Sequence, residues 1–119
     1  MKRVLATALA VGGLTAVLGA QEPAKPGPGV TMPVLVKRVN PDYTAEAKAR
    51  RIQGNVVLGC VVLTTGAVDR VTVVRSLDAM YGLDEQAVKA MKQWTFKPGT
   101  KDGQPVPVSI QVEMTFWLK

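Results

Sequence analysis

The chain has 119 residues, in which 15 Lys and Arg outnumber 9 Asp and Glu, and it contains no His. This length suits one small domain with a single hydrophobic core. The basic residues are scattered without an aromatic platform beside them, which argues against nucleic-acid binding. Without His, the usual Cys/His and Ser/His catalytic pairs and His-based metal sites are excluded, and we expect neither a metal nor a cofactor.

The first 20 residues are typical of a signal peptide. Lys2 and Arg3 form a basic start, residues 4–18 are mostly apolar, and Ala20 is the small residue required before a cleavage point. Cleavage there would release the chain into the periplasm. The alternative is a retained signal-anchor in the inner membrane, although the apolar run is shorter than the roughly 20 residues that a spanning helix needs.

A segment rich in Pro and Gly follows at residues 21–32. Both residue types disfavour helix and sheet, so this segment is expected to be a short extended tether. Position 21 is Gln rather than Cys, so no acyl anchor is expected. The folded domain is then expected over residues 33–119.

The domain begins with a lead-in and a short helix. Residues 34–39 are compatible with a short strand or an extended lead-in, and residues 40–43 form a turn because Asn precedes Pro and Asp follows it. Thr44 is a suitable N-cap for a helix, and Gly54 is expected to stop that helix.

A hairpin is expected next, from an apolar strand at 56–63, a turn at 64–67 and a second strand at 68–76. Gly66 supplies the positive φ that the turn demands. In the first strand both the odd and the even positions are apolar, which predicts a strand buried on both faces or central in its sheet. Cys60, the single cysteine, is expected to be a small buried hydrophobe.

A helix over residues 83–94 would place its apolar residues on one stripe, with acidic residues at its start and basic residues toward its end. Trp94 and Phe96 continue that stripe and are expected to be core anchors rather than a ligand cage. The candidates for carboxylate catalysis are Asp69, Asp78, Asp84 and Glu85. The last two are explained more simply as charges at a helix start, and we expect no enzymatic role.

The last strand shows a clean alternation. From Val106 to Phe116 every even position is apolar, while the odd positions are polar or Pro. This pattern predicts a half-buried strand. A short helix followed by one long C-terminal strand can leave a sheet edge open, and an open edge can bind another strand. The expected function is therefore binding.

Several short motifs occur along the chain in a fixed order. They are Pro41-Asp42-Tyr43, Ala49 to Val56, Thr65 to Val68, Val73 to Ser76, Leu83 to Ala87, Gln93 to Pro98 and Gly103 to Val106. In this order and spacing they resemble the C-terminal domain of the TonB family of energy transducers, and the resemblance covers nearly everything from Pro33 to Lys119.

The resemblance implies an α+β fold, with a three-stranded antiparallel sheet formed by the hairpin and the last strand and two helices packed on it. In the family the C-terminal strand lies at an edge, where the TonB box, a short peptide of an outer-membrane transporter, adds beside it. The implied function is that of a periplasmic, non-catalytic binding module in energy-dependent transport. The partner-binding residues implied by position are Asn40, Pro41, Asp42, Tyr43, Val108, Ser109, Ile110, Gln111, Val112, Glu113, Met114, Thr115 and Trp117.

The sequence departs from the family pattern in three ways. Thr44 follows Tyr43 where the family usually has Pro, the tether is short, and the His that engages the proton-driven inner-membrane motor is absent. The missing His argues against motor coupling of the known kind. The alternative function is a self-associating module, an edge-strand homodimer, for which Val57, Val61, Leu63 and Trp117 would supply contacts.

Overall fold

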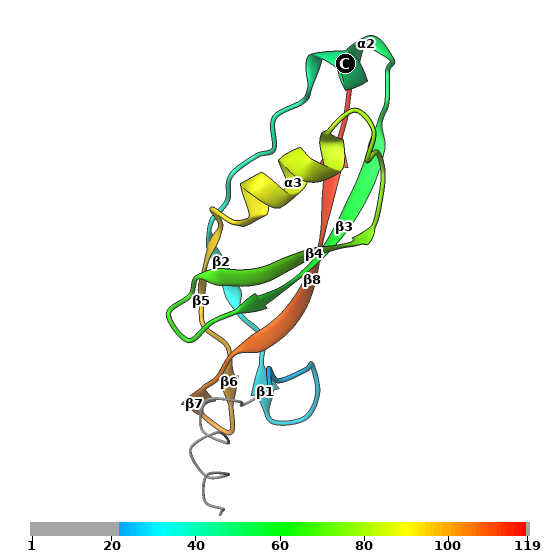
Figure 1. Ribbon diagram of the computed structural model, residues 1–119. Coiled ribbons are helices and arrows are strands. Elements are labelled where there is room, and N and C mark those ends of the chain that lie inside the picture. Colours follow the sequence, from blue (N-terminus) through cyan, green and yellow to red (C-terminus); the bar gives the residue numbers. More distant parts are fainter. Residues whose placement is uncertain (1–21, 119) are drawn as a thin grey trace, which may run out of the picture.

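The computed structural model describes residues 22–118, so the predicted signal peptide lies outside the described residues. Its main sheet has three antiparallel strands in the order β4–β3–β8 (Figure 1). These strands are β3 (Gly54–Val62), β4 (Val68–Arg75) and β8 (Val108–Phe116). The predicted hairpin, the central position of its first strand and the α+β class are confirmed. The last strand begins at Val108, two residues later than its alternation predicted.

Within residues 22–118 two helices accompany the sheet, α2 (Ala45–Ala49) and α3 (Leu83–Met91). Thr44 caps α2 as predicted, because its side chain accepts a hydrogen bond from the backbone N–H of Ala47 at 3.2 Å. The expectation that Gly54 stops this helix was wrong. Arg51 ends it by adopting a left-handed conformation with φ of 56°, whereas Gly54 is the first residue of β3.

The hydrophobic core lies between α3 and the sheet, with α3 crossing one face (Figure 1). Its buried members include Leu83, Ala87, Ala90 and Met91 of α3, Val56, Leu58, Cys60 and Val62 of β3, and Met114 and Phe116 of β8. Trp94 and Phe96 are only 5% and 8% exposed, which confirms both as core anchors. The helix itself ends three residues before the predicted position 94.

Five short strands complete the fold. They are β1 (Val30–Thr31), β2 (Val34–Lys37), β5 (Thr95–Lys97), β6 (Thr100–Lys101) and β7 (Gln104–Pro105). The strand β2 pairs with β5, while β1, β6 and β7 form a small separate sheet. The sequence predicted only β2 among them, as one of two alternatives. Because β1 lies within residues 21–32, this part of the predicted tether is paired with the domain.

The turn between β3 and β4 also binds β5. Gly66 has φ of 89°, as predicted, and its carbonyl accepts a hydrogen bond from the N–H of Phe96 at 2.9 Å. A Cβ atom at position 66 would lie 2.1 Å from the carbonyl oxygen of Phe96. The turn therefore requires Gly both for its backbone conformation and for this close approach.

Candidate binding edge

The strand β8 has one open side. It pairs with β3 over nine residue pairs without a register shift, from Val108 to Phe116. On its other side the described part of the chain supplies one bridge, in which the N–H of Ser109 donates to the carbonyl of Ala24 at 2.9 Å. Backbone groups alternate in direction along a strand, so the N–H and C=O groups of the following odd positions also point away from β3. These open positions are Gln111, Glu113 and Thr115.

The side chains at the open positions are polar and exposed. Two of them are oriented by Asn55 of the neighbouring strand, whose side-chain amide donates to Glu113 Oε2 at 3.2 Å and accepts from Thr115 Oγ1 at 2.8 Å. This edge therefore presents free backbone groups beside a fixed row of polar side chains.

The segment at residues 40–43 lies beside the last part of this edge, and it is an irregular connection before α2, so the predicted turn was wrong. A hollow of about 240 Å³ is lined by Arg38, Asn40, Pro41, Tyr43, Trp94, Met114, Thr115, Phe116 and Trp117. Two segments distant in the sequence thus form one surface, and six of the predicted partner-binding residues line it.

The segment at residues 40–43 is held in place by aromatic side chains. The indole N–H of Trp94 donates to the carbonyl of Val39 at 2.7 Å, and the guanidinium of Arg38 lies 5.7 Å from the Trp94 ring centre. The hydroxyl of Tyr43 donates to the carbonyl of Ile52, and its ring packs edge-to-face on Phe116 with centroids 5.5 Å apart. A surface fixed in this way loses less conformational entropy when a partner binds.

The structure distributes the remaining predicted residues unevenly. Val108 is fully buried and its backbone groups point toward β3. Ile110 and Val112 are half-buried on the core side, and Asp42 is exposed but does not line the hollow. Arg38 and the contact of Trp94 with Val39 were not predicted from the sequence. The signal for the latter was the indole N–H, which needs an acceptor when it is buried.

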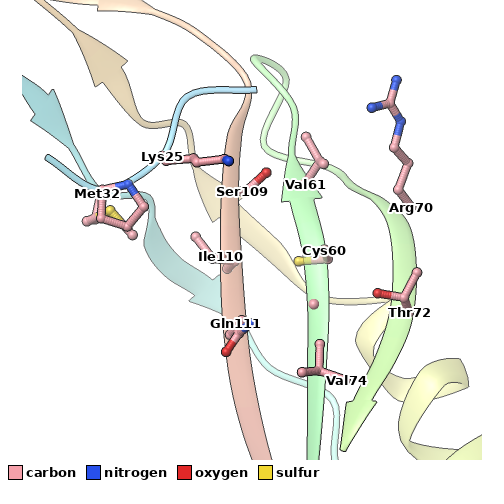
Figure 2. Close-up of a pocket in the computed structure, with 12 residues that line it drawn as sticks. Lys25, Met32, Cys60, Val61, Arg70, Thr72, Val74, Ser109, Ile110 and Gln111 are labelled. Atoms are coloured by element: carbon pink, nitrogen blue, oxygen red, sulfur yellow. The ribbon is translucent and has the colours of Figure 1, made fainter. Parts of the chain in front are cut away.

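A second hollow, of about 700 Å³, spans all three strands of the main sheet near the start of β8 (Figure 2). It is lined by Ser109, Ile110 and Gln111 of β8, by Lys25, Pro26 and Met32, and by Gly59, Cys60, Val61, Arg70, Thr72 and Val74 of β3 and β4. Burial raises the pKa of the Cys60 thiol to about 11. The thiol therefore stays protonated near neutral pH and is a poor nucleophile, and its burial as a small hydrophobe is confirmed.

Two of the candidate catalytic carboxylates are used to fix the loop before α3. Asp84 accepts hydrogen bonds from the N–H groups of Leu77 and Asp78, both at 3.0 Å, and from the hydroxyl of Ser76. Asp78 accepts from the N–H groups of Tyr81 and Leu83. Since the N-cap residue is a glycine without a side chain, Asp78 satisfies a backbone donor of the first turn in its place. The interpretation of Asp84 as only a helix-start charge was therefore incomplete.

The environment of Asp84 changes its acidity. Burial pushes the pKa of this carboxyl upward, but the hydrogen bonds from Ser76, Asp78 and Leu77 outweigh burial and leave it below its ordinary value of 3.8. Asp69 lies in exposed surroundings, 3.9 Å from the Nε of Arg70. Within residues 22–118 there is no group of three or more Cys, Asp or Glu residues placed to hold a metal ion.

The fold and this edge define a class of small α+β domain in which one strand of the main sheet stays open beside a fixed connecting segment. The chain belongs to the family described as Gram-negative bacterial TonB protein C-terminal, which matches residues 39–118. A helix long and apolar enough to cross a membrane does not occur in the described part of the chain.

Curated relatives carry the same domain. The chain is 31% identical to "Protein TonB" of Vibrio cholerae over 110 residues, covering 83% of this chain and 45% of that protein. It is 37% identical to "Protein TonB" of Escherichia coli K12 over 79 residues, covering 66% and 32% respectively. The chain thus spans less than half the length of these relatives. The solution NMR structure of the Pseudomonas aeruginosa TonB CTD has the same fold, with a TM-score of 0.59 and 21% sequence identity. The match covers 81% of this chain and 94% of that chain.

Proposed function

We propose that this domain is a non-catalytic periplasmic binding module that acts in energy-dependent transport. Its partner is an extended TonB-box-like peptide of an outer-membrane transporter, which adds as a further strand to the open edge of β8. Main-chain hydrogen bonds would supply affinity that tolerates different sequences, and nearby side chains would select the partner.

The observation that carries this proposal is the open edge beside the segment at 40–43. Within residues 22–118 the outward backbone groups of Gln111, Glu113 and Thr115 have no strand partner, and the hollow of about 240 Å³ lies where an added strand would pass that segment. Family membership supports a role of the TonB kind. The use of Asp78 and Asp84 in backbone hydrogen bonds supports a role without catalysis.

The test is a pull-down from the envelope extract of the source organism, with the purified full chain as bait. A Gln111→Pro variant removes one outward N–H, and a Gln111→Ala variant is the matched control because it removes the side chain but keeps the N–H. We expect outer-membrane transporters to be captured by the unaltered chain and by Gln111→Ala, and to be lost with Gln111→Pro. Equal capture by all three would show that this edge does not bind the partner.

A second candidate function is self-association through the same edge. Trp117, directly after the end of β8, is 73% exposed, and Trp side chains are enriched at protein interfaces. A dimer would appear in sedimentation as a species of twice the mass that disappears on dilution and in the Gln111→Pro variant. A monomer at all concentrations would exclude this candidate.

A further inference from the structure

The open edge of β8 is occupied at its beginning by the chain itself. Ala24 donates its N–H to the carbonyl of Pro107 at 2.8 Å and accepts from the N–H of Ser109 at 2.9 Å. The two segments run parallel, and Ala24 lies opposite Val108. This is one complete unit of a parallel ladder, formed by a residue from outside the matched family region.

The next unit of that ladder cannot form completely. Two residues further along, position 26 would lie opposite Ile110, donate to the carbonyl of Ser109 and accept from the N–H of Gln111. Position 26 is Pro, which has no N–H to donate. Pro26 lines the second hollow, whose lining also includes Ile110 and Gln111. The ladder therefore stops at the boundary between Ser109 and Gln111.

The segment that contains Ala24 is anchored to the domain by the residues that follow it in the chain. The N–H of Asp102 donates to the carbonyl of Gly29 at 2.8 Å, and β1 pairs with β6 directly afterwards. A turn closed by a hydrogen bond from Val30 to Gly27 lies between this anchor and Ala24. Such a short connection keeps Ala24 at a high effective concentration beside the edge.

We propose that residues 22–26 form a built-in edge cap, with Ala24 covering the β8 edge at Val108–Ser109 and Pro26 setting the point at which the open edge begins. The part of the edge left for a partner runs from Gln111 toward Trp117, and we call it the partner footprint. This assignment rests on the proposed function. The cap also shortens the unpaired edge, and a shorter unpaired edge is a poorer template for pairing with further strands.

The first test is hydrogen exchange of individual amides, measured by NMR on the full chain. We expect the Ser109 amide to exchange more slowly than the Gln111 amide. Ala24→Pro removes the N–H donated to Pro107 and should accelerate Ser109 exchange about fivefold, as the loss of one hydrogen bond would. Pro26→Ala restores the missing donor and should slow Gln111 exchange by a similar factor. The Leu58 amide of the central strand should be unchanged in both variants.

Each outcome decides the proposal. Equal exchange at Ser109 and Gln111 in the unaltered chain would overturn the cap, and so would an Ala24→Pro variant with unchanged Ser109 exchange. A Pro26→Ala variant without slower Gln111 exchange would overturn the assignment of Pro26 as the stop. This measurement uses no partner, so it decides the cap even if the proposed function fails.

The partner footprint has its own test in the envelope pull-down. We expect Pro26→Ala to capture less transporter than the unaltered chain, because its cap covers the first residue of the footprint. Undiminished capture by a variant with slower Gln111 exchange would overturn the footprint. An empty pull-down with every bait would instead reject the proposed function and leave the cap intact.

Discussion

The two edge strands of the main sheet are built in opposite ways. Along β8 the pairing with β3 runs without interruption, and the outward odd positions 109–115 carry a single charge, Glu113. Along β4 the register shifts twice, and Arg70 adopts a left-handed conformation with φ of 52°. Bulges and charged side chains are common ways to keep an edge from pairing. The comparison indicates that one edge is protected while the other is left available over most of its length.

The protected edge is also fastened at both ends. Its start is bridged to β5 through Ala67 and Thr95, next to the close contact of Gly66 with Phe96. Its end runs into the loop that Asp84 holds by three hydrogen bonds. Among the residues that the structure describes, the open edge is paired only with Ala24. Substitutions at the two ends of β4 should therefore affect folding, whereas substitutions at the exposed outward positions of β8 should affect binding.

The largest effect is expected inside β8 itself, on its buried face. Met114 is 2% exposed, so Met114→Asp should cost about 4 kcal/mol or more and unfold much of the population, because an unpaired buried charge is costly. Ile110→Asp, on a half-buried residue, should cost less. Gln111→Asp is the control on the exposed face and should change the unfolding free energy by about 0.5 kcal/mol or less. Urea unfolding followed by circular dichroism measures all three, and equal losses would contradict a half-buried strand.

The turn at the start of the protected edge provides the next test. Gly66→Ala should cost about 3 kcal/mol, from a strained positive φ together with a Cβ placed against the Phe96 carbonyl. Gly103→Ala is the matched control. It also has a positive φ, of 84°, but no atom lies within 4 Å of its added Cβ, so it should cost about 1 kcal/mol. Similar costs for the two variants would mean that the contact with Phe96 contributes nothing.

The loop at the end of the protected edge should give a pH-dependent effect. The pKa of Asp84 is lower in the folded chain than its ordinary value of 3.8, so the carboxylate stabilises the fold above that value and loses this contribution as the pH falls through the folded pKa. Asp84→Asn should therefore cost about 2 kcal/mol at pH 7, with a difference from the unaltered chain that shrinks below about pH 4.

Thermal unfolding at a series of pH values measures this difference. Glu85→Gln is the control, because Glu85 is the exposed neighbour in the same first helical turn. A difference between Asp84→Asn and the unaltered chain that stayed constant from pH 7 to pH 3 would contradict the assigned role of the carboxylate.

The smallest effect on stability should come from proline at the open edge. Gln111→Pro removes an outward N–H and should cost about 1 kcal/mol or less, whereas Val112→Pro removes an N–H that points toward β3 and should cost about 3 kcal/mol. The two variants differ by one position in the same strand. Their unfolding free energies should therefore separate clearly, and equal values would show that β8 is not open on one side.

Much of the main sheet was predictable because its strands carry strong local patterns. The alternation from Val106 to Phe116 identified β8, and Gly66 identified the turn of the hairpin. That residues 40–43 lie next to the C-terminal edge strand was predicted from the family resemblance, because the sequence of each segment alone does not indicate this contact. Six of the thirteen predicted partner-binding residues line the hollow beside residues 40–43.

What was missed depends on contacts between distant backbone groups. Strands of two or three residues such as β1 and β6 are too short to show a period, and the bridge from Ala24 to the β8 edge leaves no side-chain pattern. Likewise, Arg51 ends α2 in a conformation that sequence reasoning assigns to Gly. The carboxylates of Asp78 and Asp84 could be recognised as loop anchors only once their donors were located.

The two tryptophans lie in contrasting environments, so intrinsic tryptophan fluorescence can report binding at the open edge. Trp94 is buried beneath Arg38, while Trp117 is 73% exposed and lines the hollow at the end of the open edge. The emission of an indole shifts to shorter wavelength when water is removed from around it, so arrival of a strand at this end would be visible in Trp117 without a label. Trp94 has to stay in place because its indole N–H is bonded to Val39, so its emission from the core serves as the constant reference for Trp117.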